Sequence, residues 1–166
     1  MSMSESSEGW GRVLKAFDDW ISYESSEFAP WTAYFSPENL RDLTDKERMG
    51  WMHSMYSEVI PGRVESCKSV AVAFEDFLPY MPDTAAIETV RSMIDLSTRI
   101  QDSMLGMSDV ITTMLEGYKL GGLDEVFHYL SSLAEAEEDI RHHMTLYSAG
   151  FRKLKKLGLT IPEEMM

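Results

Sequence analysis

The stretch "YKLGGLD", residues 118–124, separates two long runs of apolar residues and decides how the second half of the chain folds. In both runs the apolar positions alternate in steps of four and three, which is the spacing of a heptad seam. The first seam is Ala86, Val90, Met93, Ser97, Ile100, Met104, Met107, Ile111 and Met114. The second is Val126, Leu130, Leu133, Glu137, Ile140, Met144, Tyr147, Phe151 and Leu154. The sequence therefore predicts two amphipathic helices joined by a glycine turn.

The register of this αα-hairpin follows from the same residue numbers. If the chain folds back at Gly121 and Gly122, facing seam residues keep a nearly constant sum, so Ile100 faces Ile140 and Ala86 faces Leu154. Small residues then lie opposite large ones, as an interdigitated core requires. Each arm has about 35 residues and a length of roughly 50 Å. Such a hairpin needs further helices to cover its broad apolar faces.

The first half of the chain supplies two such segments. Apolar spacing from Trp10 predicts a shorter N-terminal helix, and "TDKE", residues 44–47, is a capping box that opens a helix over 45–79. Pro61 either ends or kinks that helix. We expect a kink, because a helix over 45–79 matches the length of the hairpin arms. The predicted fold is all-α, an elongated four-helix-like bundle.

Composition suits one domain with a single core, since 44% of the 166 residues are apolar. We expect a Ser- and Glu-rich disordered tail over 1–8, one helical-bundle domain over 9–158 and a C-terminal tail over 159–166.

The formal net charge of −13 makes the protein acidic. Phosphate backbones repel such a surface, so we expect no nucleic-acid partner. No apolar run approaches the roughly 18 residues of a transmembrane helix. The start "MSMSESSEGW" has no basic or apolar signal region, and the single cysteine, Cys67, excludes an intrachain disulfide. These features favour a cytoplasmic location.

The methionine-rich stretch "ERMGWMHSMY", residues 47–56, raises the question of a soft-metal site. Met49, Met52 and His53 share one helix face, and two thioethers with an imidazole suit Cu(I). The same methionines also continue an apolar stripe, and methionine often fills helical cores. Core packing is the main interpretation, with copper binding as the alternative.

A second metal hypothesis involves His142. Glu125 with His128, and Asp139 with His142, follow the carboxylate-x-x-His spacing of di-iron bundles. Both pairs lie on one predicted helix, roughly 21 Å apart, which is too far for one dinuclear centre. We therefore expect no cofactor, and copper or iron is the alternative.

Glu137 is the one strongly polar residue of its seam, where it faces Met104. A buried carboxylate must be paired or hydrogen-bonded, and Arg141 lies one helical turn away. We interpret Glu137 as a polar residue that fixes the helix register.

Aromatic residues gather in "FAPWTAYFSP", residues 28–37. Phe28, Trp31, Tyr34 and Phe35 either close one end of the bundle or anchor a partner, because aromatic side chains are the usual anchors of interfaces.

The sequence contains no Ser-His-Asp pattern, phosphate-binding glycine loop or zinc spacing. We therefore expect a non-enzymatic scaffold, adaptor or structural protein that binds another protein. We also expect a homodimer, because a short N-terminal helix leaves apolar surface uncovered. One alternative is a metal-binding bundle, ferritin-like or copper-binding. Another is an amphipathic coat protein of an apolar granule or lipid surface.

Overall fold

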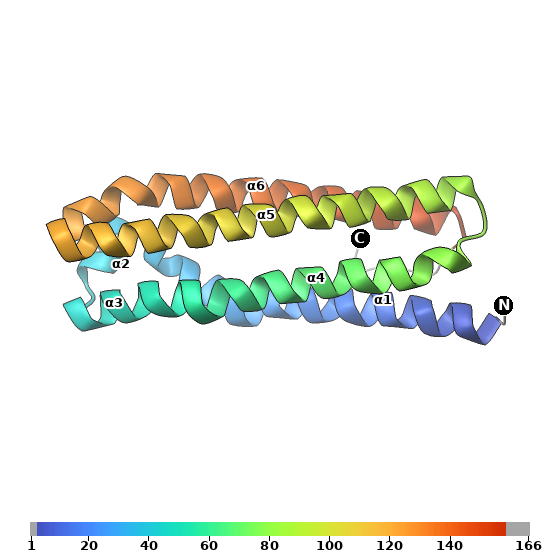
Figure 1. Cartoon of the computed structure of the whole chain (residues 1–166), viewed down its shortest axis with the longest axis horizontal. Coiled ribbons are helices and arrows are strands. Elements are labelled where there is room, and N and C mark those ends of the chain that lie inside the picture. Colours follow the sequence, from blue (N-terminus) through green and yellow to red (C-terminus); the bar gives the residue numbers. More distant parts are fainter. Residues whose placement is uncertain (1–2, 159–166) are drawn as a thin grey trace.

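The computed structural model describes residues 3–158 as an elongated all-α bundle (Figure 1), which confirms the predicted fold class. No strand occurs in these residues. Its long helices are α1 (Met3–Tyr23), α4 (Ile60–Phe77), α5 (Thr84–Gly121) and α6 (Leu123–Lys156). The short helices α2 (Pro37–Arg41) and α3 (Asp45–Ser54) lie at the end of the bundle where α5 turns into α6.

Helices α5 and α6 form the predicted hairpin, and Gly122 makes the turn. Its φ of 79° is a conformation that suits glycine, and its N–H donates to the Tyr118 carbonyl at 2.9 Å. Every predicted seam residue of α5 is buried, as is every one of α6 except the half-buried Met144. The Ser103 hydroxyl donates to Asp139 at 3.0 Å, a contact that fits the predicted register.

The helix over 45–79 continues through Pro61. Both hydrogen bonds of the Thr44–Glu47 capping box are present. Helix α3 then passes through a π-helical turn, η3 (Met55–Val59), into α4, and Pro61 falls in the first turn of α4. The wider turn accommodates the missing proline N–H. Helix α4 leads into a single 3₁₀ turn, η4 (Leu78–Tyr80).

The N-terminal segment is longer than the sequence predicts. Helix α1 begins at Met3 and not near residue 9, where we expected the disordered tail to end. Gly9 is buried, and a Cβ there would lie 2.9 Å from the Phe77 ring, so this glycine lets α1 approach α4 closely. The predicted C-terminal tail, 159–166, lies outside the described residues.

After Tyr23 the chain stays helical through a π-helical segment, η1 (Glu24–Phe28), and a 3₁₀ segment, η2 (Ala29–Phe35). Both η2 and α2 contact α6. The gap expected beside a short N-terminal helix is therefore occupied by residues 29–41, which removes the original reason for expecting a dimer.

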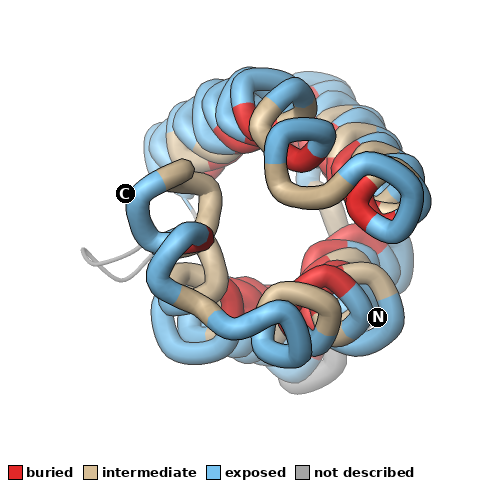
Figure 2. Tube along the Cα trace, turned by 90° about the vertical axis from the view of Figure 1, so that its left-hand side faces the viewer, coloured by how far each residue is buried: buried red, intermediate tan, exposed pale blue. Residues whose placement is uncertain are grey.

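The core lies inside the ring of long helices, where the buried residues gather (Figure 2). Large aromatic side chains fill the space between α1 and α6. Phe17 stacks on Tyr147 with ring centroids 5.9 Å apart, and its centroid lies 4.6 Å from that of Phe151. Trp20 meets the same Tyr147 ring edge-on at 5.6 Å.

Two glycine substitutions test this packing. A Cβ at Gly62 would overlap the Tyr23 hydroxyl, which donates to the Val59 carbonyl at 2.7 Å. We expect Gly62→Ala to destabilise the protein by about 1–3 kcal/mol, because it crowds a fixed side chain. Gly106, inside α5, has open space around it, so Gly106→Ala should stabilise by up to about 1 kcal/mol. Urea unfolding measures the free energy of unfolding of both variants. Equal unfolding midpoints for Gly62→Ala and Gly106→Ala would contradict the close approach of α1 to α4.

Candidate functional site

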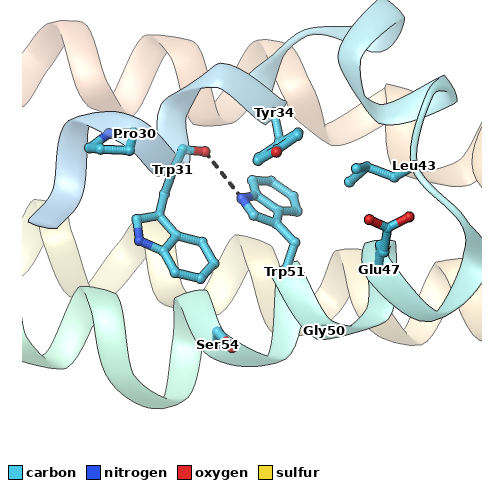
Figure 3. A pocket seen from close by; sticks show the side chains of 8 residues that line it. All are labelled: Pro30, Trp31, Tyr34, Leu43, Glu47, Gly50, Trp51 and Ser54. Carbon is cyan, nitrogen blue, oxygen red and sulfur yellow. Dashed lines mark hydrogen bonds between the residues drawn. The ribbon is translucent and has the colours of Figure 1, made fainter.

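An open aromatic pocket lies beside α3, at the end of the bundle where α5 turns into α6 (Figure 3). Its volume is about 560 Å³. The lining residues come from η2, α3 and the segment between them: Pro30, Trp31, Tyr34, Leu43, Glu47, Gly50, Trp51 and Ser54.

Trp51 forms the floor of the pocket. Its side chain is only 4% exposed, and its indole N–H donates to the Trp31 carbonyl at 3.1 Å. The rings of Tyr34 and Phe35 meet the Trp51 ring edge-on, with centroids 5.9 and 6.0 Å away. This hydrogen bond and these ring contacts hold the irregular η2 segment against α3.

Polar contacts fix the other walls. The Arg48 guanidinium donates to the carbonyls of Leu40 and Arg41 at 2.7 and 2.9 Å, which joins α2 to α3. The Tyr118 hydroxyl donates to Asp45 and so fastens the start of α3 to α5. Because four helical segments support it, the pocket is a preformed feature of the fold.

Trp31 is in a different environment from Trp51, which forms the floor of the pocket. Its ring is half-buried, and within residues 3–158 it makes neither a hydrogen bond nor a contact with another aromatic ring. Part of the ring packs against the core, and the indole N–H and the exposed part of the ring are available at the pocket wall. Aromatic side chains in this situation are costly to leave in water and are frequent anchors of interfaces.

Glu47 adds a negative charge on the side of Trp51 that lies away from Trp31 (Figure 3). The hydrogen bond from the Thr44 backbone N–H lowers the pKa of its carboxyl, which is therefore ionised at neutral pH. No cationic side chain among the described residues lies within ion-pair distance of it.

The four aromatic residues predicted as interface anchors have different environments. Trp31 and Tyr34 line the pocket, and Phe35 supports its floor. Phe28 is fully buried beneath the Arg63 guanidinium, with 3.7 Å between the guanidinium carbon and the ring centroid, so a partner cannot reach it. The segment thus closes one part of the bundle and lines a pocket in another.

A buried ion cluster lies in the middle of the bundle. Arg63 is 0% exposed, and its guanidinium donates to both oxygens of Glu24 at 2.7 Å. On its other side it donates to both oxygens of Glu137 at 2.8 and 3.0 Å. The Trp20 indole N–H donates to Glu24 at 3.2 Å. Burial acts to lower the pKa of Arg63, but the two carboxylates outweigh it and the pKa is raised, so the guanidinium stays charged.

The placement of Glu137 agrees with its predicted burial, since it is 8% exposed. Arg141, the partner available from the sequence, lies 3.0 Å away. The principal partner, Arg63, was missed. The sequence does contain a signal for it, because Arg63 continues the alternating seam of α4 between Ile60 and Cys67.

A second buried polar layer lies one helical turn along α4 from the ion cluster. Cys67 and Ser97 place their side chains 3.3 Å apart, and burial raises the pKa of the Cys67 thiol to about 11. The thiol is thus protonated and inert at neutral pH. The Tyr147 hydroxyl is buried without a hydrogen-bond partner in the described structure, and burial raises its pKa well above the ordinary value.

The predicted metal ligands do not share one environment. Met52 is fully buried and Met49 half-buried, whereas His53 is exposed and its Nδ1 lies 3.0 Å from the Tyr56 hydroxyl. His142 is exposed on α6, beside His143. Among the described residues, no group of three or more His, Cys, Asp or Glu side chains could hold a metal ion. In the same residues no helix is long and apolar enough to cross a membrane.

Comparison with known proteins gives no relative. No family model, curated protein or solved structure matches this chain.

The ion cluster gives a stability prediction. Arg63→Met leaves the Glu24 carboxylate without a counter-charge and Glu137 with only the exposed Arg141, and it should destabilise the protein by about 3–5 kcal/mol in urea unfolding. Arg141→Met removes the 63%-exposed partner and should cost less than about 1 kcal/mol. The triple variant Glu24→Gln, Arg63→Met, Glu137→Gln should recover part of the loss. A loss below 1 kcal/mol for Arg63→Met would mean that the cluster does not hold the helices together.

Proposed function

We propose that this chain is a non-enzymatic interaction protein, and that its rigid bundle presents the aromatic pocket to a partner protein. The observation that carries the proposal is Trp31, a half-buried indole that makes no ring contact or hydrogen bond with the residues that the structure describes, at the wall of an open pocket. Preformed pockets lined by aromatic side chains with a few polar groups are typical binding sites.

The arrangement of the rest of the surface supports the same proposal. The large apolar side chains that are most exposed lie on four different helices: Ile21, Val72, Leu105, Leu120 and Leu146. A coat protein needs one continuous apolar face, so this distribution gives little support to the lipid or granule alternative. The copper candidates Met52 and His53, one fully buried and the other exposed, likewise give little support to a copper site.

A photo-crosslinking experiment tests the pocket as a docking site. The photoreactive amino acid p-benzoylphenylalanine replaces Tyr34 in the full chain, expressed in its own cell. We expect one adduct of defined mass. It should disappear with the additional change Trp31→Ala, because the partner then loses its contact with the indole ring.

The matched control places the same photoreactive group at Tyr56, a half-buried tyrosine that does not line the pocket. No adduct from position 34, or the same adduct from position 56, would contradict docking at the pocket.

Self-association has a separate basis on α6. Leu146 is 46% exposed and lines an open groove together with Met93 and Leu96, and a second groove, lined by Ile21 and Met144, also includes residues of α6. The acidic run 135–139 and the basic run 152–156 lie on either side of Leu146. An antiparallel α6–α6 contact around Leu146 would pair these runs across a two-fold axis. We infer a homodimer of this kind.

Light scattering after size exclusion tests the dimer at micromolar concentration and about 0.15 M salt. We expect twice the 19.0 kDa chain mass. Leu146→Glu should give the monomer mass, because it places charge on the two-fold axis. Leu105→Glu, at a similarly exposed site on α5, should leave the dimer intact. A monomer for the unmodified chain would rule out this interface.

A further inference from the structure

The chemistry of the aromatic pocket identifies the group that it fits. We propose that the pocket binds an arginine side chain of the partner protein, with its guanidinium against Glu47 and its methylene stem over the aromatic floor. This inference rests on the proposed docking role of the pocket and adds the chemical identity of the docked group.

Glu47 supplies the charge. One oxygen, Oε1, accepts from the Thr44 N–H at 2.9 Å, and the carboxylate is exposed to a partner. The carboxylate is negative at neutral pH and stands next to aromatic side chains. A carboxylate combined with ring faces is a site for an organic cation, which gains from the charge and from the π-electrons together.

Elsewhere in this protein, arginine guanidinium groups already lie over aromatic rings. In the buried cluster, the Arg63 guanidinium lies over the Phe28 ring and bonds to carboxylates on either side. On the surface, the Arg41 guanidinium lies 4.9 Å from the centroid of the Phe127 ring. At the pocket, the Trp51 ring and the Glu47 carboxylate are present, and no guanidinium of the described chain lies between them.

Arginine fits better than the other side chains that could enter. Its planar guanidinium stacks on rings and can donate two parallel hydrogen bonds to a carboxylate, whereas lysine carries a compact and more strongly hydrated charge. A purely apolar side chain would leave Glu47 facing an uncharged group. The volume of about 560 Å³ also leaves room for residues on both sides of the arginine. The net charge of −13 attracts a basic partner before contact.

The direct test titrates the full ¹⁵N-labelled chain with the peptide acetyl-Gly-Arg-Gly-amide and follows the tryptophan indole N–H resonances by NMR. The Trp31 resonance, assigned with Trp31→Phe, should shift and saturate. The citrulline analogue has nearly the same shape without the charge, and it should bind at least about tenfold more weakly. The lysine analogue should also bind more weakly than arginine.

Two variants test whether the Glu47 carboxylate is the group that binds the arginine. Glu47→Gln should weaken arginine binding about fivefold or more, and it keeps the helix start, because glutamine also completes a capping box. Glu38→Gln is the matched control, since Glu38 is an exposed carboxylate in the first turn of α2, outside the pocket. It should bind the peptide like the unmodified chain.

The outcomes separate the two proposals. Equal binding of the arginine and citrulline peptides, no effect of Glu47→Gln, or no saturable shift with any peptide would overturn the arginine assignment. A pocket adduct from position 34 in the crosslinking experiment would then still support docking of a different group. Charge-dependent arginine binding without any such adduct would keep the assignment and remove the partner-docking role.

Discussion

The rest of the structure depends on the Arg63 guanidinium, which is enclosed without water access between two carboxylates. Glu24, Arg63 and Glu137 come from three separate segments of the chain, so this one charge links η1, α4 and α6. A shift of any of them by one helical turn would leave a buried charge without its partner, at a cost of several kcal/mol. Apolar seams alone tolerate such shifts more easily, because one methionine or leucine can replace another.

The cluster also lies next to both π-helical segments of the described residues. The π-helical segment η1 begins at Glu24 and ends at Phe28, and both residues contact Arg63. The π-helical turn η3 ends at Val59, one turn before Arg63, and its carbonyl accepts from Tyr23. Because Phe28 is fixed beneath the guanidinium, the start of η2 is fixed too. The position of Trp31 and Tyr34 at the pocket therefore follows from a charge in the core.

The predictable part of this fold was the part governed by periodicity. The seams of α5 and α6 repeat over nine positions each, and the glycine turn between them leaves one antiparallel register. Such a pattern was absent from residues 24–43, where tertiary contacts with Arg63 and Trp51 stabilise π and 3₁₀ segments of low intrinsic preference. Arg63 itself was overlooked because charged residues are normally excluded from a seam. One charged residue on a seam position of each of two helices, Arg63 and Glu137, was the available indication that they would pair. The pocket could not be derived, since Glu47 and Trp31 come to line one pocket only through the fold of η2.

The order of contacts along the chain also bears on how the protein folds. Helices α4, α5 and α6 are consecutive and antiparallel, so each packs on a neighbour in sequence, and such local topologies fold quickly. The bond between Arg63 and Glu137 instead joins residues 74 positions apart. It can form only after α4 and α6 have both docked, which makes it a late step. A wrongly aligned bundle would reach that step with an unpaired charge in its centre and would reopen, so the cluster selects the correct bundle during folding.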